Sequence, residues 1–277
     1  MKKIAYLICA VAALFSAHAM AAGGSGPLFH MNVDVGNQKS LQRGAAYFVN
    51  YCLSCHSAEF SRYKRVAEDL GISEENMRDY MMFTGRKYGD TMTVAMTAEQ
   101  GKEWFGAAPP DLSVRARARG ADWIYSFLKS FYVDNASNRG INNKMLAGTS
   151  MPHVLWELQG YQMLNEDFEA LTEKDIASLG PRYAQLNKEI ATGQAVDHEE
   201  DGQHGADDHS PFTLVVKGEL TPEEYDQVVT DIVNFMVYMS EPAQLSRRTI
   251  GTGVLFFLAA LFVLVYFMKR DYWKDIH

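Results

Sequence analysis

Two cysteines and a histidine stand together in the segment CLSCH, which runs from Cys52 to His56. The spacing C-x-x-C-H is typical of c-type haem attachment, in which both sulfurs bond covalently to the porphyrin and the histidine ligates the iron. We therefore expect one covalently bound haem c, with Cys52 and Cys55 as its anchors. This motif limits the fold, because the chain must enclose a large flat group next to these three side chains.

Two other uses of a cysteine pair are less compatible with the flanking sequence. A redox dithiol would lie where a strand meets a helix, and the segments SLQRGAAYFVNY and SAEFSRYKR predict no such strand. Structural zinc would need a second pair of Cys or His at ligand spacing, and none follows. The motif therefore favours haem.

The first 22 residues, MKKIAYLICAVAALFSAHAMAA, are typical of an export signal. A head with Lys2 and Lys3 precedes an apolar run, and small residues follow where a signal peptidase cuts. Removal of residues 1–22 also removes Cys9, so the mature chain keeps only Cys52 and Cys55. We expect no structural disulfide, because both remaining thiols are assigned to haem.

An uncharged apolar segment, IGTGVLFFLAALFVLVYFM, runs from Ile250 to Met268. As a helix it would be about 28 Å long, close to the roughly 30 Å thickness of the hydrocarbon layer. We predict one transmembrane anchor at residues 247–270, in contact with membrane lipid. The tail 271–277 is expected in the cytoplasm, because the signal exports the preceding body and the flanking Lys269 and Arg270 follow the positive-inside rule.

Residues 23–246 form the exported body, which is acidic. It contains 19 basic and 32 acidic residues, a net charge of about −13. Such a charge excludes nucleic acid as a partner and favours a cationic one. The segment 193–211 is acidic, polar and rich in histidine, and we interpret it as a flexible loop rather than a metal site.

Two helices are strongly indicated. The first, at residues 40–51, carries apolar residues at helical spacing, with Ser40 as a possible N-cap, and ends at the cysteines. The second begins with a capping box of Thr221 and Glu224, and its apolar stripe consists of Tyr225, Val228, Val229, Ile232, Phe235, Met236 and Met239. The simplest arrangement packs the two helices together, with Gly44 allowing a close approach.

The remaining segments predict a mainly α domain with long loops. Residues 72–83 and 120–134 have helical patterns, whereas AAPPDLS and TSMPH contain prolines that favour loops. No segment alternates strongly enough to predict a sheet core.

An electron-carrying haem benefits from a second protein ligand, and several residues could supply it. Met151 lies in GTSMPHV, where Pro152 restricts the backbone and Gly148 lets the loop bend. The alternatives are Met145, Met92 and Met96, and His153 would give a bis-histidine site. The local sequence leaves this choice open.

Haem propionates need cationic partners when they are partly buried. The segment DLSVRARARGADW offers Arg115, Arg117 and Arg119, and guanidinium groups suit bidentate pairing with carboxylates. If the segment is helical, Arg115 and Arg119 share a face.

Together these pieces resemble the cytochrome c1 family, the haem subunits of ubiquinol:cytochrome c oxidoreductase. The resemblance lies in CLSCH, AAPPDLSVRARARGADWIYSFLKSFY, GTSMPH and MSEPAQLSRRTIGTGVLFFLAALFVLVYFMKR, which occur in the expected order. It implies a class I c-type cytochrome-like haem domain plus one C-terminal transmembrane helix. By this likeness Cys52 and Cys55 are thioether anchors, His56 is the proximal ligand, Met151 the distal ligand and Arg119 a propionate partner.

The resemblance also implies a function. Such a chain takes electrons from the Rieske iron-sulfur subunit and passes them to a soluble or tethered cytochrome c, in a complex with cytochrome b. It is not an enzyme by itself. With a simple bacterial signal, residues 23–246 would be periplasmic and the anchor would lie in a bacterial inner membrane. Two other classes remain as alternatives: a haem sensor with an open coordination position, and a haem enzyme such as a peroxidase or a dehydrogenase subunit.

Overall fold

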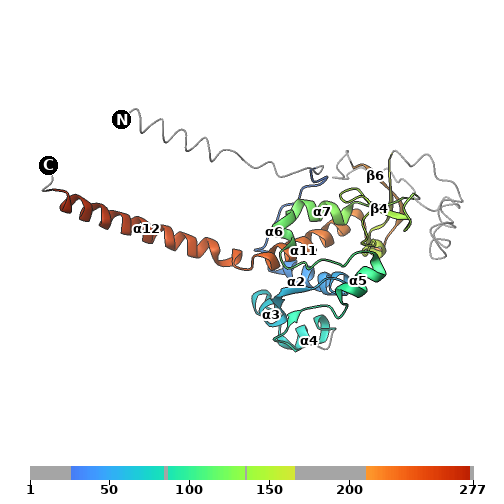
Figure 1. Ribbon diagram of the computed structural model, residues 1–277, viewed down its shortest axis with the longest axis horizontal. Helices are drawn as coiled ribbons and strands as arrows, with labels where there is room; N and C mark the ends of the chain where they lie inside the picture. Colours follow the sequence, from blue (N-terminus) through green and yellow to red (C-terminus); the bar gives the residue numbers. More distant parts are fainter. Residues whose placement is uncertain (1–25, 84–86, 135, 166–209, 275–277) are drawn as a thin grey trace.

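The computed structural model describes residues 26–83, 87–134, 136–165 and 210–274. The predicted signal peptide, at residues 1–22, and nearly all of the acidic loop at 193–211 lie outside the described residues. Figure 1 shows a helical body from which one long helix projects. In the described ranges the helices are α2 (Gln38–Tyr47), α3 (Tyr63–Leu70), α4 (Glu74–Met81), α5 (Ala98–Phe105), α6 (Arg115–Arg119), α7 (Ala121–Lys129), α8 (Trp156–Gln159), α11 (Pro222–Ser240) and α12 (Gln244–Tyr272), with a π-helix at Phe48–Cys52.

The strands of the described residues are short and form antiparallel pairs among the helices, so the predicted mainly α fold is confirmed. In the described residues the pairs are β1 (Ala58–Arg62) with β2 (Thr91–Met92), β3 (Phe131–Val133) with β4 (Ile141–Asn143), and β5 (Gly160–Leu164) with β6 (Phe212–Lys217). Each pair is a separate two-stranded ladder, which agrees with the prediction that no sheet forms the core.

Helices α2 and α11 cross in the centre of the domain, as the sequence predicts. A Cβ atom built on Gly44 would lie 2.0 Å from the backbone oxygen of Asp231, so only glycine permits this approach. The rings of Phe48 and Phe235 pack beside the crossing with their centroids 5.4 Å apart. The predicted apolar stripe of α11 is buried along its whole length: Tyr225, Val228, Val229, Ile232, Phe235, Met236 and Met239.

The buried carboxylate of Asp231 joins the two helices by polar contacts. It accepts hydrogen bonds from Ser40 Oγ at 2.5 Å and from Arg43 Nε at 2.6 Å. This bond to Asp231 raises the pKa of Arg43 above its usual value, so the guanidinium stays charged. Asn234, one turn further along α11, donates to the same Ser40 hydroxyl at 3.0 Å. Because a buried carboxylate needs such partners, this crossing has a defined register.

Two local predictions need correction. Ser40 is not the N-cap of α2; Asn37 caps it, because its side chain accepts a hydrogen bond from the Ser40 backbone N–H, while the Ser40 hydroxyl faces Asp231. The helix expected at 120–134 ends at Lys129, and the chain continues into β3, because its aromatic and β-branched residues pair with β4. The capping box of Thr221 and Glu224 at the start of α11 is confirmed.

Helix α12 contains the predicted membrane span. It is 29 residues long with a mean hydropathy of 2.5 in its most apolar window, and among the described residues it is the helix long and apolar enough to cross a membrane. The apolar side chains from Val254 to Met268 are largely exposed rather than packed on the body, as expected of a surface that meets lipid. Lys269 and Arg270 lie in its last turn.

The close approach of α2 and α11 at Gly44 can be tested by substitution. Gly44→Ala should destabilise the domain by about 2 kcal/mol or more, because the new methyl group meets backbone, which cannot rotate away. Thermal unfolding of the purified chain, followed by circular dichroism, measures this. Gly89→Ala is the control, since a Cβ there meets nothing within 4 Å. Equal unfolding temperatures for the two variants would contradict the close packing at Gly44.

Candidate haem site

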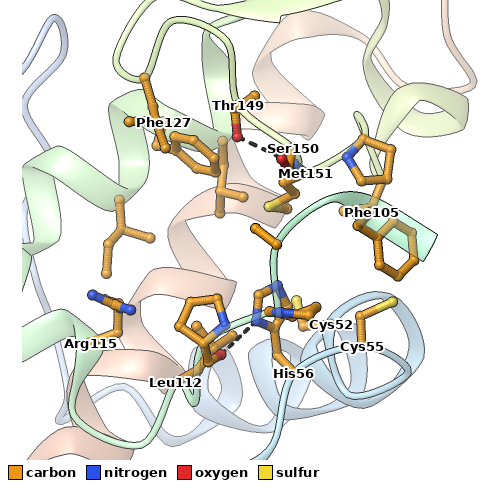
Figure 2. Close-up of a pocket in the computed structure, with 18 of the residues that line it drawn as sticks. Cys52, Cys55, His56, Phe105, Leu112, Arg115, Phe127, Thr149, Ser150 and Met151 are labelled. Atoms are coloured by element: carbon orange, nitrogen blue, oxygen red, sulfur yellow. Dashed lines mark hydrogen bonds between the residues drawn. The ribbon is translucent and has the colours of Figure 1, made fainter. Parts of the chain in front are cut away.

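A largely apolar cavity of about 440 Å³ lies between the CLSCH segment, α6, α7, α11 and the loop that carries Met151. Figure 2 shows Cys52, Cys55 and His56 together on one side of this cavity and Met151 on the opposite side. The four predicted haem-binding residues come from two segments about a hundred residues apart. The structure places all four in the wall of one cavity.

The CLSCH segment is presented by the end of the first helix. α2 continues directly into the π-helix Phe48–Cys52, after which the backbone N–H of His56 donates to the carbonyl of Cys52 at 2.9 Å. This tight turn directs Cys52, Cys55 and His56 at the same cavity. Both cysteines are free thiols. Burial raises the pKa of Cys52 to about 12, so its thiol is neutral at physiological pH.

The imidazole of His56 is oriented by the backbone of a proline loop. Its Nδ1 lies 2.7 Å from the carbonyl oxygen of Pro110, which can only accept a hydrogen bond. The proton must therefore be on Nδ1, and Nε2 keeps a lone pair for a metal. Burial lowers the pKa of His56, which also favours the neutral ligand form. The loop itself is held by Leu112, whose N–H donates to the Ser57 carbonyl at 2.8 Å.

Among the sixth-ligand candidates, Met151 is the one in the cavity wall. Met92, Met96 and Met145, each within the described part of the chain, lie outside that wall. So does His153, which is buried and stacks on Phe131 with ring centroids 5.0 Å apart. Burial lowers the pKa of His153 to about 4, so this imidazole is a neutral core group.

A second methionine, Met236 of α11, also lines the cavity. The sequence pattern predicts only that it belongs to the apolar stripe of that helix. Its position one turn after Ile232, another wall residue, shows that the stripe serves both the helix crossing and the cavity. Periodicity alone cannot separate these two roles, because both require an apolar side chain on the same face.

Side-chain amides hold the loop that carries Met151. Asn143, which is fully buried at the end of β4, accepts hydrogen bonds from two successive backbone N–H groups of this loop at 2.9 and 3.2 Å. Asn142 accepts from the N–H of Gly148 at 2.8 Å, where φ is +69°. The Met151 N–H donates to Thr149 Oγ1 at 3.3 Å (Figure 2). Neither asparagine was predicted as a site residue, although the pair NN before a glycine-containing loop is a turn signal.

Two arginines lie at the α6 side of the cavity. Arg115 and Arg119 both line it, as expected if the segment is helical, and Arg117 of the same helix does not. The guanidinium of Arg119 lies over the ring of Trp123, 4.8 Å from its centroid. Arg115 is partly buried and Arg119 exposed, so both offer cationic donors near the cavity edge.

The donor set of the cavity fits a c-type haem. Two thiols and an imidazole with its Nε2 lone pair lie on one wall, a thioether lies opposite, and most of the lining is apolar. Thiols, imidazole and thioether are the groups that this cofactor bonds to, and a guanidinium can pair with its propionates. The volume also lies in the range of cofactor sites, about 300–1,000 Å³.

Comparisons with known proteins agree with this site. The family described as "Cytochrome C1 family" matches residues 29–178 and 214–276. A cytochrome c1 of Allochromatium vinosum is 43% identical over 93% of both chains, and one of Rhodospirillum rubrum is 25% identical over 87% of this chain and 83% of its own. A protein of Nitrosomonas europaea named "Ammonia monooxygenase gamma subunit" is 40% identical over 100% of both chains.

The likeness thus covers the haem-site segments, the body and the helix that can span a membrane. The chain belongs to the cytochrome c1 family: it is a membrane-anchored, haem c-containing electron carrier of the respiratory bc1 complex, and it serves there as an electron-transfer subunit rather than as an enzyme in its own right.

Proposed function

We propose that this chain accepts single electrons from the Rieske iron-sulfur subunit and delivers them to a soluble or tethered cytochrome c. The observation that carries the proposal is the placement of His56 and Met151 on opposite walls of one cavity, with Cys52 and Cys55 beside the histidine. When bound there, haem c supplies a one-electron iron couple.

Each wall residue then has a specific role. Cys52 and Cys55 form the two thioethers, His56 provides the proximal nitrogen through Nε2, and Met151 provides the distal sulfur. Arg119 pairs with a propionate, and Arg115 stands in reach of the same edge. With two strong protein ligands the iron site changes little between oxidation states, and a methionine opposite a histidine raises the potential. The apolar lining excludes water from both ligands.

The charge and topology of the chain support the proposed partners. The exported body carries a net charge of about −13, which would attract a basic cytochrome c over long distances. Cytochrome b and the Rieske subunit are the expected neighbours in the membrane, with lipid around α12. We place the haem domain in the bacterial periplasm and the C-terminus in the cytoplasm, since the signal at residues 1–22 precedes the body and Lys269, Arg270 and Lys274 follow the span.

The name of the Nitrosomonas relative raises a second candidate, a subunit that takes part in oxygen chemistry. A haem that binds oxygen, like one in a sensor or a peroxidase, needs a free coordination position. Met151, which lies across the cavity from His56, would fill such a position. This arrangement favours the carrier, and the methionine variant described below distinguishes the two candidates.

Isolation of the complex tests the proposed electron route. A tag on the C-terminal tail should recover cytochrome b and the Rieske subunit together with this chain, and added quinol should reduce its haem. The same preparation with the Rieske subunit removed should leave the haem oxidised, because the electron donor is missing. Equal reduction with and without the Rieske subunit would contradict the route.

Haem attachment should survive denaturation, because thioethers persist when coordination bonds break. The mature chain, boiled in detergent and separated on a gel, should keep its haem stain. Cys52→Ala should leave at most one thioether, and replacing both cysteines should abolish the stain. Ser54→Ala, in the same segment, is the matched control and should stain as the wild type does. A stain lost from the intact chain would contradict covalent attachment.

Met151→Leu should retain the haem, since Cys52, Cys55 and His56 remain, but lose the distal ligand. The reduction potential should fall by more than about 60 mV, the shift that equals a tenfold change in a one-electron equilibrium. The reduced variant should bind carbon monoxide, whereas the wild type should not. Met236→Leu, which changes the other methionine of the wall, should retain the sixth ligand. Ready binding of carbon monoxide to the wild type would favour the oxygen-chemistry candidate.

A further inference from the structure

One arginine outside the cavity wall connects two parts of that wall. Arg139 comes from the connection between β3 and β4, and its Nη1 donates to the carbonyl of Thr149 at 3.2 Å. Its Nη2 donates to the carbonyl of Phe105 at 2.6 Å. Thr149 lies two residues before Met151, and Phe105 is the last residue of α5. Both carbonyl-bearing residues line the cavity. A single guanidinium therefore joins the Met151 loop to the adjacent end of α5.

The chemistry of both contacts suits an arginine. Phe105 ends α5, so its carbonyl lacks an i+4 partner within the helix and carries part of the negative end of the helix dipole. The chain then turns away at Gly106, where φ is +81°. A guanidinium has several donors in a fixed plane and can serve two carbonyls at once, whereas a lysine ammonium is a point charge on a flexible stem.

The backbone around Arg139 is held by hydrogen bonds within the β3–β4 connection. In its hairpin connection Ser137 Oγ donates to the carbonyl of Ile141 at 2.9 Å, and Asn142 Nδ2 donates to Asp134 Oδ2 at 2.8 Å. The same Asn142 side chain accepts a hydrogen bond from the Gly148 N–H in the Met151 loop. The hairpin and its connection therefore hold the backbone before Met151 at neighbouring points, through Asn143 at residues 145 and 146, through Asn142 at Gly148 and through Arg139 at Thr149.

We propose that Arg139 is a positioning residue that latches the Met151 loop to the end of α5 and so controls how readily an external ligand can displace the Met151 sulfur. This inference rests on the proposed ligation by Met151. Arg139 does not line the cavity, so it acts through the loop backbone. Without the latch the loop remains tethered by Asn142 and Asn143 but samples open positions more often. An external ligand that binds the open form then binds with higher apparent affinity, in proportion to the open fraction.

The test is an imidazole titration of the oxidised, haem-loaded full-length chain in detergent, followed by its absorption spectrum. Arg139→Ala should bind imidazole about tenfold more tightly than the wild type, a change equal to about 1.4 kcal/mol. Arg139→Lys should lie between them, because one ammonium can satisfy one of the two carbonyls more easily than both.

Arg62→Ala is the matched control. Arg62 also donates from Nη1 to a backbone carbonyl, that of Gly89, at 2.8 Å, and its substitution removes the same charge. Arg62 lies outside the cavity wall, so the Arg62→Ala variant should bind imidazole with the affinity of the wild type. Both variants should unfold at similar temperatures, since each loses one exposed arginine. A wild-type affinity in Arg139→Ala, or an equal gain in Arg62→Ala, would overturn the latch.

A third variant separates failure of the latch from failure of the proposed ligand. Met151→Leu removes the competing sulfur and should bind imidazole at least as tightly as Arg139→Ala. If it does and Arg139→Ala behaves as the wild type, the latch is wrong and the ligand assignment stands. If Met151→Leu leaves the imidazole affinity unchanged, Met151 is not the distal ligand, and the proposed site and the latch are both wrong.

Discussion

The close crossing of α2 and α11 at Gly44 is the contact on which the rest of the structure depends. It is made possible by the absence of a side chain at that position and given its register by the buried carboxylate of Asp231. Because α2 continues directly into the π-helix that ends at Cys52, any movement of this crossing would move the cysteines and His56. The face of α11 that packs on α2 extends to Ile232 and Met236 in the cavity wall, so one interface sets both the core and one side of the site.

The two sides of the cavity are built on different principles. The side with His56 is an extension of a helix, stabilised by regular backbone hydrogen bonds and by the contact of His56 with Pro110. The side with Met151 is an irregular loop, whose backbone is held by amide side chains from β4. A loop of this kind has few backbone hydrogen bonds of its own, so its position depends on hydrogen bonds from individual side chains. The side with Met151 is therefore where single substitutions can move a residue of the cavity wall without disturbing the fold.

The sequence predicted those features whose signals are local. The CLSCH motif, the capping box of α11 and its apolar stripe each lie within a few turns of chain, and the structure places all three as expected. The pairing of α2 with α11 was also predictable, because a glycine in an otherwise good helix indicates close packing. The strand pairs were not predicted, since β3 and β4 are three residues each and the residues of β3 also fit the helical pattern of the segment 120–134. The wrong N-cap at Ser40 has a similar cause: its hydroxyl is used by Asp231, a partner 191 residues away that no local rule can anticipate.

The choice among the methionines shows where local sequence reasoning ends. The four candidate methionines are chemically identical, and they differ in their position in the fold. Met151 lines the cavity, whereas Met145, Met92 and Met96 do not. The β3–β4 hairpin contributes to the placement of Met151, because Asn142 and Asn143 of β4 hold the backbone of the loop before it. The hairpin connection also supplies Arg139, so the element that the sequence did not predict is the one that holds the loop of Met151. A carrier must hold this side firmly enough to exclude other ligands, and a loop whose backbone is fastened at several points before Met151 by polar groups from one short hairpin satisfies that requirement without a further helix.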